Sequence, residues 1–335
     1  MYQLFIGIDV SKDWIDAACW AQGQAQAQAL DRFANSVEGF EQFVLAVKQQ
    51  QSVPQSRWLI CFENTGHYSK LLLLWLFEQG IPCVEENALQ IARSKGITRG
   101  KADMVDACVI CAYAKRHGDK LTPTIPDHQA IATLKRLLAQ RRLFVRQRAA
   151  LITARRANSP EITQIQQQEL KAMTDEVIAM LSKQIDSLEL MIDQLISAQQ
   201  ELQTNCTLLQ SIAGIGPVVA WHLLACTKNF SSFQSARQFA CYAGIAPFPN
   251  QSGSSIHGKD RVHYLANRHM KALLSNSVLA AIKTDPEIQN YFTRKRAEGK
   301  EFGTVANAIK NKIVSRAFAV VKRQTPYVSI MQYAS

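Results

Sequence analysis

Four acidic residues in the first third of the chain have types and spacings that suit a cation site. Asp9 ends the first apolar run of the sequence, and Glu63 ends a later one. Neighbouring buried strands can bring two such ends together. Asp103 and Asp106 are three residues apart in a predicted helix, which places their Cβ atoms about 5–6 Å apart on one face. We therefore expect the four carboxylates to converge.

Carboxylates gathered in a partly buried place repel one another unless they share cations. A set of hard oxygen ligands without His or Cys favours Mg²⁺ or Mn²⁺, ions that activate a nucleophile and stabilise the leaving oxygen of a phosphodiester. Each acid alone has an ordinary alternative: Asp9 could be a turn residue, and Asp103 could complement a helix dipole. Asp13 and Asp16 are less well placed, and we expect them at the surface.

The segments that must position these acids alternate between strand and helix patterns over residues 1–120. The expected strands are 4–8, 14–20, 32–34, 58–62 and 81–84, and the expected helices are 36–50, 69–79 and 102–117. Three strands followed by helix, strand, helix, strand and helix is the element order of an α/β ribonuclease-H-like domain, with an antiparallel meander at one side of a mixed sheet.

Residues 121–204 predict a helical arm. Eight basic residues and no acid lie between positions 128 and 160, namely Lys135, Arg136, Arg141, Arg142, Arg146, Arg148, Arg155 and Arg156. Apolar residues then recur in steps of three and four from Ile178 to Leu202, with Gln199 as one polar position. This heptad seam predicts a coiled coil, formed either with the basic helix or with a second protomer.

Residues 205–335 predict a mainly α C-terminal domain. Gly214 and Gly216 permit a tight turn before a helix that starts at Pro217, which resembles a helix-hairpin-helix motif. The backbone amides of such a turn can hold a DNA phosphate. A plain helix-to-helix turn is the alternative.

A loop rich in Gly and Ser is expected over residues 242–261, and it contains Ser252. A serine hydroxyl beside cations could reach a phosphate, although a serine in such a loop is most often a turn residue. The basic residues in and after the loop could anchor phosphates; they are Lys259, Arg261, Arg268 and Lys271.

The composition points to a polyanionic partner. The chain has 335 residues and a formal net charge of +11, a balance common in nucleic-acid-binding proteins. No signal peptide is expected, the longest apolar run (71–77) is too short to span a membrane, and the eight cysteines are scattered. We expect a cytoplasmic protein that is not inserted in a membrane.

Together these segments resemble the insertion sequence 110 family of transposases and the related Piv-type DNA invertases. In the N-terminal part the resemblance rests on the DEDD acids of a RuvC-like domain, within Gly7–Lys12, Glu63–Tyr68 and Lys101–Ala107. In the C-terminal part it rests on Ile212–Pro217, Phe239–Pro247 and Gln251–Gly253. Two positions depart from the family pattern: Ala102 replaces a common Thr, and Phe248 replaces a common basic residue.

The resemblance implies that Asp9, Glu63, Asp103 and Asp106 bind Mg²⁺ or Mn²⁺, and that Ser252 attacks the DNA backbone to form a covalent phosphoserine. It also implies double-stranded donor and target DNA, a structured bridge RNA as guide, and a homodimer or homotetramer. The acids and the serine are distant in sequence, so the site would have to be assembled in three dimensions, within one chain or between protomers.

Three rival functions remain open at this point: a metal-dependent nuclease that uses water alone, an ATPase of the actin and sugar-kinase superfold, and a non-catalytic DNA-binding protein. The second requires Gly-rich phosphate loops, which the sequence does not show.

Overall fold

The computed structural model describes residues 2–94, 103–156, 163–252 and 256–329, with the backbone alone at 103–104, 249–252 and 256–261. The chain divides into two compact units, residues 1–126 and 127–335. All eight cysteines are free thiols. Every helix in the described ranges is too short or too polar to cross a bilayer.

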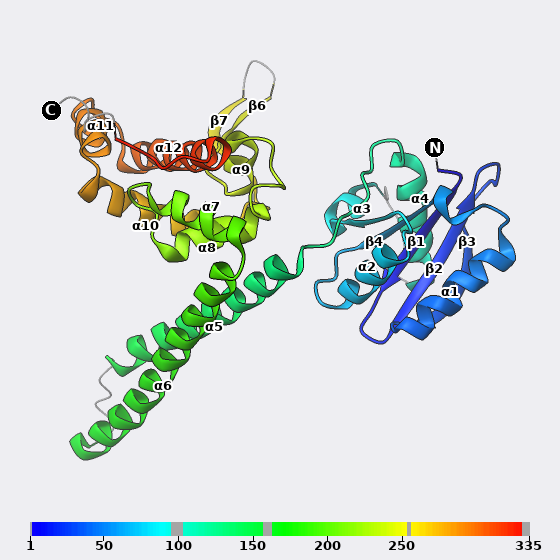
Figure 1. Ribbon diagram of the computed structural model, residues 1–335, viewed down its shortest axis with the longest axis horizontal. Helices are drawn as coiled ribbons and strands as arrows, with labels where there is room; N and C mark the ends of the chain where they lie inside the picture. The colour runs from blue at the N-terminus through cyan, green and yellow to red at the C-terminus, as the bar shows by residue number, and fades with distance from the viewer. Residues whose placement is uncertain (1, 95–102, 157–162, 253–255, 330–335) are drawn as a thin grey trace. The chain divides into compact units, whose positions relative to one another are not determined.

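The first unit contains a five-stranded mixed sheet in the order β3-β2-β1-β4-β5 (Figure 1). Its strands are β1 (Leu4–Val10), β2 (Trp14–Ala21), β3 (Gln28–Ala34), β4 (Trp58–Glu63) and β5 (Cys83–Glu86). The first three form an antiparallel meander, while β4 and β5 run parallel to β1. This topology confirms the predicted ribonuclease-H-like class.

Helices cover both faces of this sheet. One face packs on α1 (Val37–Gln50) and α2 (Tyr68–Glu78), and the other packs on α4 (Asp103–His117). A short 3-10 helix (Gln55–Arg57) precedes β4, and α3 (Ala88–Ser94) follows β5. Ser36 caps α1 as predicted, because its hydroxyl accepts the backbone N–H of Gly39.

The alternation of side chains along β1 explains the two faces. Leu4, Ile6 and Ile8 are fully buried against the α1 and α2 side. Gly7 points to the opposite face, where an added Cβ would lie 2.1 Å from the backbone nitrogen of Cys111. Only glycine therefore lets α4 approach β1 this closely.

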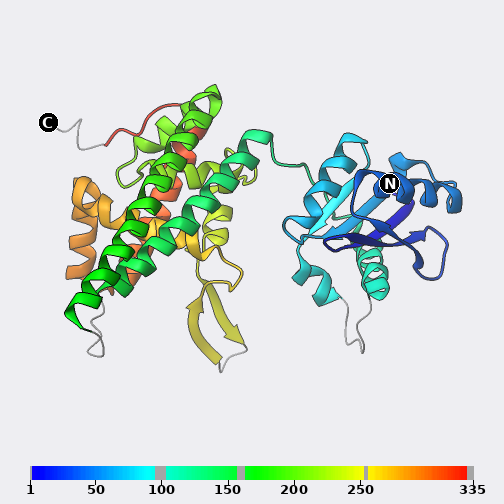
Figure 2. The ribbon, with the colours of Figure 1, turned by 90° about the horizontal axis from the view of Figure 1, so that it is seen from below.

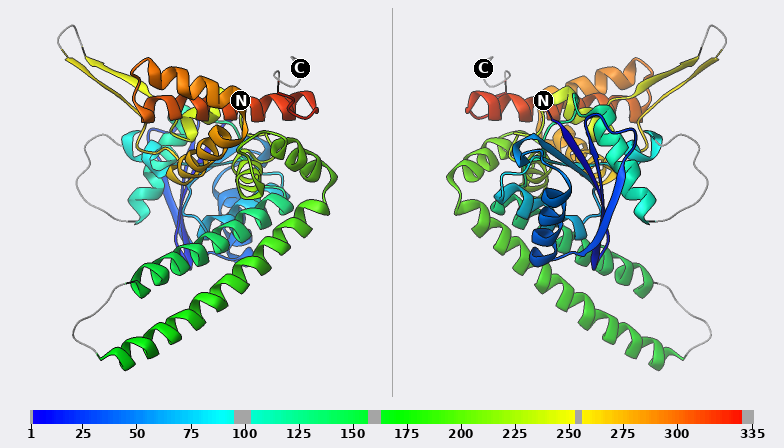
Figure 3. Two further views of the ribbon diagram at one scale, coloured as in Figure 1. Left: turned by 90° about the vertical axis from the view of Figure 1, so that its left-hand side faces the viewer. Right: turned by 90° about the vertical axis from the view of Figure 1, so that its right-hand side faces the viewer.

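The second unit begins with two long helices, α5 (Gln129–Arg155) and α6 (Gln164–Ser197), which lie side by side and run in opposite directions (Figure 3). Their polar contacts recur every seven residues in each helix. The pairs are Arg155 with Asp175, Arg148 with Ser182, and Arg141 with Glu189. This seven-residue spacing is compatible with the predicted heptad seam, and the coiled coil itself stays a prediction.

The end of the seam was placed wrongly. The sequence extends it through Gln199 to Leu202, but α6 ends at Ser197 and Gln199 is the N-cap of the next helix. Leu202 is buried among the helices of the second unit instead.

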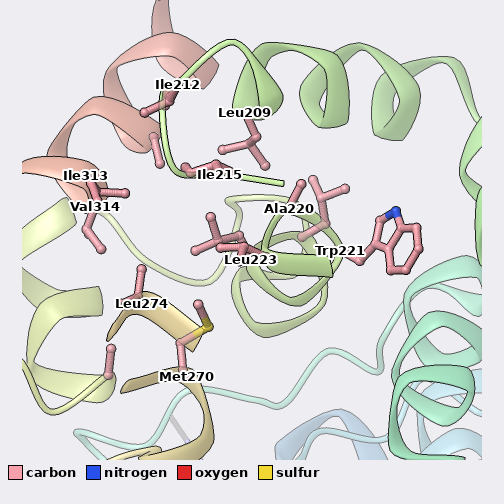
Figure 4. Close-up of a cluster of buried hydrophobic side chains, with 14 of the residues drawn as sticks. Leu209, Ile212, Ile215, Ala220, Trp221, Leu223, Met270, Leu274, Ile313 and Val314 are labelled. Carbon is pink, nitrogen blue, oxygen red and sulfur yellow. The ribbon is translucent and has the colours of Figure 1, made fainter. Parts of the chain in front are cut away.

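Those helices are α7 (Gln200–Gln210), α8 (Pro217–Thr227), α9 (Ala236–Tyr242), α10 (Arg268–Thr284), α11 (Pro286–Ala297) and α12 (Phe302–Arg323). They share one apolar core with the adjacent ends of α5 and α6, and Figure 4 shows its centre around Leu223, Met270 and Ile313. The start of α8 at Pro217 and the mainly α character of this region are as predicted.

The segment expected as a loop at 242–261 is a β-hairpin for much of its length. Strands β6 (Phe248–Ser252) and β7 (Ile256–Arg261) pair antiparallel and project from the helices of the second unit (Figure 2). The expectation failed because the Gly and Ser content suggested a turn, whereas cross-strand pairing determines the local structure.

Three consecutive residues after α8 adopt left-handed backbone conformations, although none is glycine. The φ angles of Lys228, Asn229 and Phe230 are 48°, 56° and 65°. Such conformations cost about 1–2 kcal/mol per residue, so tertiary contacts must hold this turn.

Candidate functional site

The sheet register brings Asp9 and Glu63 to equivalent positions on adjacent strands. Ile8 of β1 pairs with Phe62 of β4 in parallel register, and the two acids follow immediately. Ile8 and Phe62 belong to the core on the α1 and α2 side, so alternation directs both acids to the α4 side. Both are half-buried.

Helix α4 runs antiparallel to β1 along this face. The Cys111 thiol donates to the carbonyl oxygen of Phe5 at 3.2 Å, and Ala107, one turn earlier in α4, contacts Gly7. The N-terminal end of α4 therefore lies toward the Asp9 end of β1. Asp106 is half-buried and lies at this end of the helix.

The predicted four-acid cation site is not established by this arrangement. Among the described side chains, no three His, Cys, Asp or Glu groups lie close enough to hold a metal ion. Asp103 is the first residue of α4, but its side chain lies outside the described part. The geometry thus brings Asp9, Glu63 and Asp106 to one end of one sheet face without forming a ligand set from these three alone.

A fifth acid on this face was not selected from the sequence. Glu86 of β5 pairs directly with Glu63 of β4, so both side chains are on the same face. The Tyr113 hydroxyl of α4 donates to Glu86 at 2.9 Å. Burial, followed by the charges of Glu86 and Glu63, raises the pKa of the Cys61 thiol, which lies two residues before Glu63 on β4. Glu86 could have been selected from the sequence because it ends the fifth strand, as Asp9 and Glu63 lie at the ends of earlier ones.

The expectation that Asp16 lies at the surface was wrong, because this residue is only 4% exposed. It pairs with Asp9 in the β1–β2 register and makes two hydrogen bonds of 3.0 Å with Arg32 on β3. This bidentate ion pair compensates for the burial of the carboxylate. Asp13 is exposed, as expected.

The C-terminal candidates have a different setting. Ser252 is the last residue of β6 and pairs with Ile256, while Lys259 and Arg261 belong to β7. The side chains of all three lie outside the described part, as does Gly253. On α10, Arg268 is exposed and Lys271 is half-buried.

The two glycines of the predicted hairpin differ in their surroundings. Gly214 has a φ of +91°, and a Cβ there would lie 2.4 Å from the carbonyl oxygen of Ser277, so this glycine packs against α10. Gly216 is exposed, caps α8, and has open space around its α-carbon. The exposed N-terminus of α8 is therefore the part of the motif that an anion can approach.

At least four of the eight basic residues between positions 135 and 156 make contacts within the second unit. Arg141, Arg148 and Arg155 contact α6, and Lys135 forms a 2.5 Å ion pair with Asp127. Arg136, Arg142, Arg146 and Arg156 are exposed, and Arg155 is exposed as well. The sequence could not separate these groups, because the partners on α6 lie up to 48 residues away.

Two family models match the chain. One, described as Transposase, matches residues 6–158, and the other, described as Transposase IS116/IS110/IS902 family, matches residues 206–293. The pilin gene-inverting proteins of Moraxella bovis and Moraxella lacunata are 31% and 30% identical to this chain over 98% of both lengths. The 43.6 kDa protein of insertion element IS110 from Streptomyces coelicolor is 33% identical over 41% of this chain and 33% of its own. A structure of T. thermophilus RuvC in complex with a Holliday junction substrate matches 35% of this chain and 97% of its own, with 15% identity and a TM-score of 0.24.

Proposed function

Because this chain belongs to the IS110 family of transposases, we propose that it is a DNA recombinase that cuts and rejoins double-stranded DNA. The full-length similarity to pilin gene-inverting proteins is the observation that carries this proposal. It also favours site-specific inversion as the outcome, since the insertion-element relative aligns over less than half of either chain. Transposition is the second candidate, supported by both family models.

The acids at the ends of β1 and β4 support the metal-binding part of the proposed chemistry. Asp9, Glu63, Asp103 and Asp106 are the residues that would hold Mg²⁺ or Mn²⁺, and their hard oxygen donors fit these ions. A bound ion would stabilise charge on the phosphodiester oxygens. Glu86, held by Tyr113, adds negative charge beside Glu63 and would strengthen the attraction for a cation.

Ser252 is the proposed nucleophile. Its hydroxyl oxygen attacks the phosphorus, the bond from phosphorus to the leaving oxygen breaks, the serine proton is lost and the leaving oxygen gains one. The number of phosphate ester bonds is unchanged, so the reverse attack by a DNA hydroxyl reseals the strand without ATP.

The test is recombination of a plasmid that carries the gene with its native flanking DNA in bacterial cells. Ser252→Ala should abolish both rejoining and the covalent protein–DNA adduct, whereas Ser255→Ala, a matched change three residues later, should retain them. Rejoining by Ser252→Ala at the normal rate would show that the acids act with water or another nucleophile, as in a nuclease. Asp9→Asn should abolish cleavage, whereas full recombination in cells with Asp9→Asn would show that this acid does not carry the chemistry and would favour a non-catalytic DNA-binding role.

A structured guide RNA is proposed to bind the exposed basic residues of α5. The triple variant Arg136/Arg146/Arg156→Gln should lose any co-purifying small RNA while it keeps its stability, because these side chains are exposed. The control Arg141/Arg148/Arg155→Gln removes the same charge from positions that contact α6, and should lower stability first. An active, pure protein without RNA would support an unguided invertase.

For the organisation of the chain we retain a RuvC-like domain (1–120), a helical arm (121–204) and a transposase domain (205–335), assembled as a dimer or tetramer. A dimer or tetramer is expected because reaction on two duplexes requires several active sites. Sedimentation with and without DNA measures the number of protomers.

A further inference from the structure

A cavity of about 280 Å³ in the second unit contains polar groups that the proposed chemistry does not use. It lies among α5, α8, α9 and α10. Its polar lining consists of Lys135, Arg142, His222, Cys226, Tyr242, Asn267 and His269. The described lining includes no carboxylate, so the cavity is suited to an anion.

The inner wall of the cavity is a pair of histidines. The Nε2 atoms of His222 and His269 lie 3.4 Å apart, and the rings meet edge to face at a centroid distance of 4.7 Å. His222 is 8% exposed, so its ring is almost completely removed from solvent. With both rings neutral, one Nε2–H can donate to the other Nε2, which satisfies the pair while the cavity is empty.

Burial and the nearby charges disfavour protonation of this pair. Burial, then His269, then Arg141 and Arg142 lower the pKa of His222 to about 3. Burial and the same two arginines lower the pKa of His269. The other titratable groups that face the cavity are Lys135 on α5, Cys226 on α8 and Tyr242 on α9, and none is a carboxylate.

We propose that this cavity binds a backbone phosphate of a nucleic acid, with His222 and His269 as its inner ligands and Arg142 at its mouth. The inference rests on the proposed function, because it supplies a second contact for the same polyanion. A single phosphate oxygen can accept hydrogen bonds from two Nε2–H groups that are 3.4 Å apart, since both bonds can then be about 2.8 Å long. In that arrangement both rings carry a proton on Nε2 and no longer bond to each other.

A change of tautomer in one neutral ring is enough to supply the second Nε2–H, and the negative charge of the phosphate then favours uptake of a proton onto Nδ1 of one ring. An anion beside the pair raises the pKa of the histidines in the bound state above the value in the free state. Affinity is consequently greatest below the free-state pKa, falls by about tenfold per pH unit as pH rises from the free-state to the bound-state pKa if one proton is linked, and is constant above the bound-state pKa.

The test uses the full chain, with a 30-base-pair duplex DNA of unrelated sequence in one arm and an RNA hairpin of similar charge in the other. Calorimetric titration in two buffers of different ionisation enthalpy measures the protons taken up. We expect about one proton per bound site for the wild type and none for His222→Gln or His269→Gln. The control His117→Gln removes a histidine of the first unit and should leave the uptake unchanged. Uptake in only one arm identifies DNA or RNA as the source of the phosphate.

Two further measurements keep the inference testable if a buried variant does not fold. Arg142→Gln changes an exposed side chain and should weaken binding several-fold, and inorganic phosphate alone should shift the ring resonances of His222 and His269 in wild-type protein. DNA binding without proton uptake and without these shifts overturns the phosphate site but leaves the recombinase proposal intact. Micromolar Zn²⁺ binding that is lost in both histidine variants would assign the pair to a metal instead. Absence of any nucleic-acid binding by the wild type would count against the proposed function itself, and the phosphate titration would still test the cavity.

Discussion

Replacing Gly7 by alanine tests how α4 is positioned against the sheet. The added Cβ would lie 2.1 Å from the nitrogen of Cys111 and 2.3 Å from the carbonyl oxygen of Ala107. An ordinary contact needs about 3.4 Å, so α4 must move away by roughly 1 Å, because both opposing atoms are backbone and cannot rotate away. Overpacking of this kind costs about 3 kcal/mol.

This loss should lower the melting temperature of the first unit by roughly 10 °C in a calorimetric scan. The displaced helix carries Asp106, so recombination should fall by a further factor of about 100, measured on folded protein well below the transition. The control is Gly303→Ala in α12, where no atom lies within 4 Å of the built Cβ, and it should change neither property. If Gly7→Ala melts and recombines like the wild type, α4 does not contact β1 as described.

Three other changes probe the second unit. Asp285→Asn removes one of the two carboxylates that pair with the guanidinium of Arg316, which is 8% exposed and keeps Glu287, and should cost about 1–3 kcal/mol in chemical denaturation. Burial alone would raise the pKa of Glu287, but its ion pairs with Arg316 and a neighbouring lysine lower it. The stabilisation by Glu287 is therefore present above the ordinary glutamate pKa of about 4.3 and is lost below it, so the stability difference between wild type and Glu287→Gln should shrink as pH falls from 6 to 3. Gly214→Ala, at a φ of +91° and facing α10, should destabilise the unit, whereas Gly216→Ala should change its melting temperature little; equal effects would contradict the packing described.

The sheet and its acids could be predicted because their signals are local. A short apolar run predicts a buried strand, and Asp9 and Glu63 each lie at the end of such a run. The order of elements then places the two strands side by side. Glu86 was not predicted as a site residue because β5 is only four residues long. The register that places Glu86 beside Glu63 depends on the assembled sheet.

Burial and pairing of charged residues could not be predicted in the same way. Asp16 was expected at the surface because its partner Arg32 lies 16 residues later, across a register shift between β2 and β3. The basic residues of α5 look equivalent in sequence, yet Arg141 faces Glu189 and Arg146 faces solvent. The difference depends on the rotation of one helix against another.

The left-handed turn after α8 has a consequence for how the second unit can be divided. Lys228 forms a 2.8 Å ion pair with Asp127, Asn229 accepts a hydrogen bond from Asn205, and the ring of Phe230 packs on Phe318. Asp127 precedes α5, Asn205 lies in α7, and Phe318 lies in α12. One strained turn thus depends on residues from the beginning, middle and end of the unit, so a fragment cut anywhere between them loses part of what holds it. Truncation or transplantation of the arm is therefore expected to weaken the transposase helices as well, even where the cut avoids every helix.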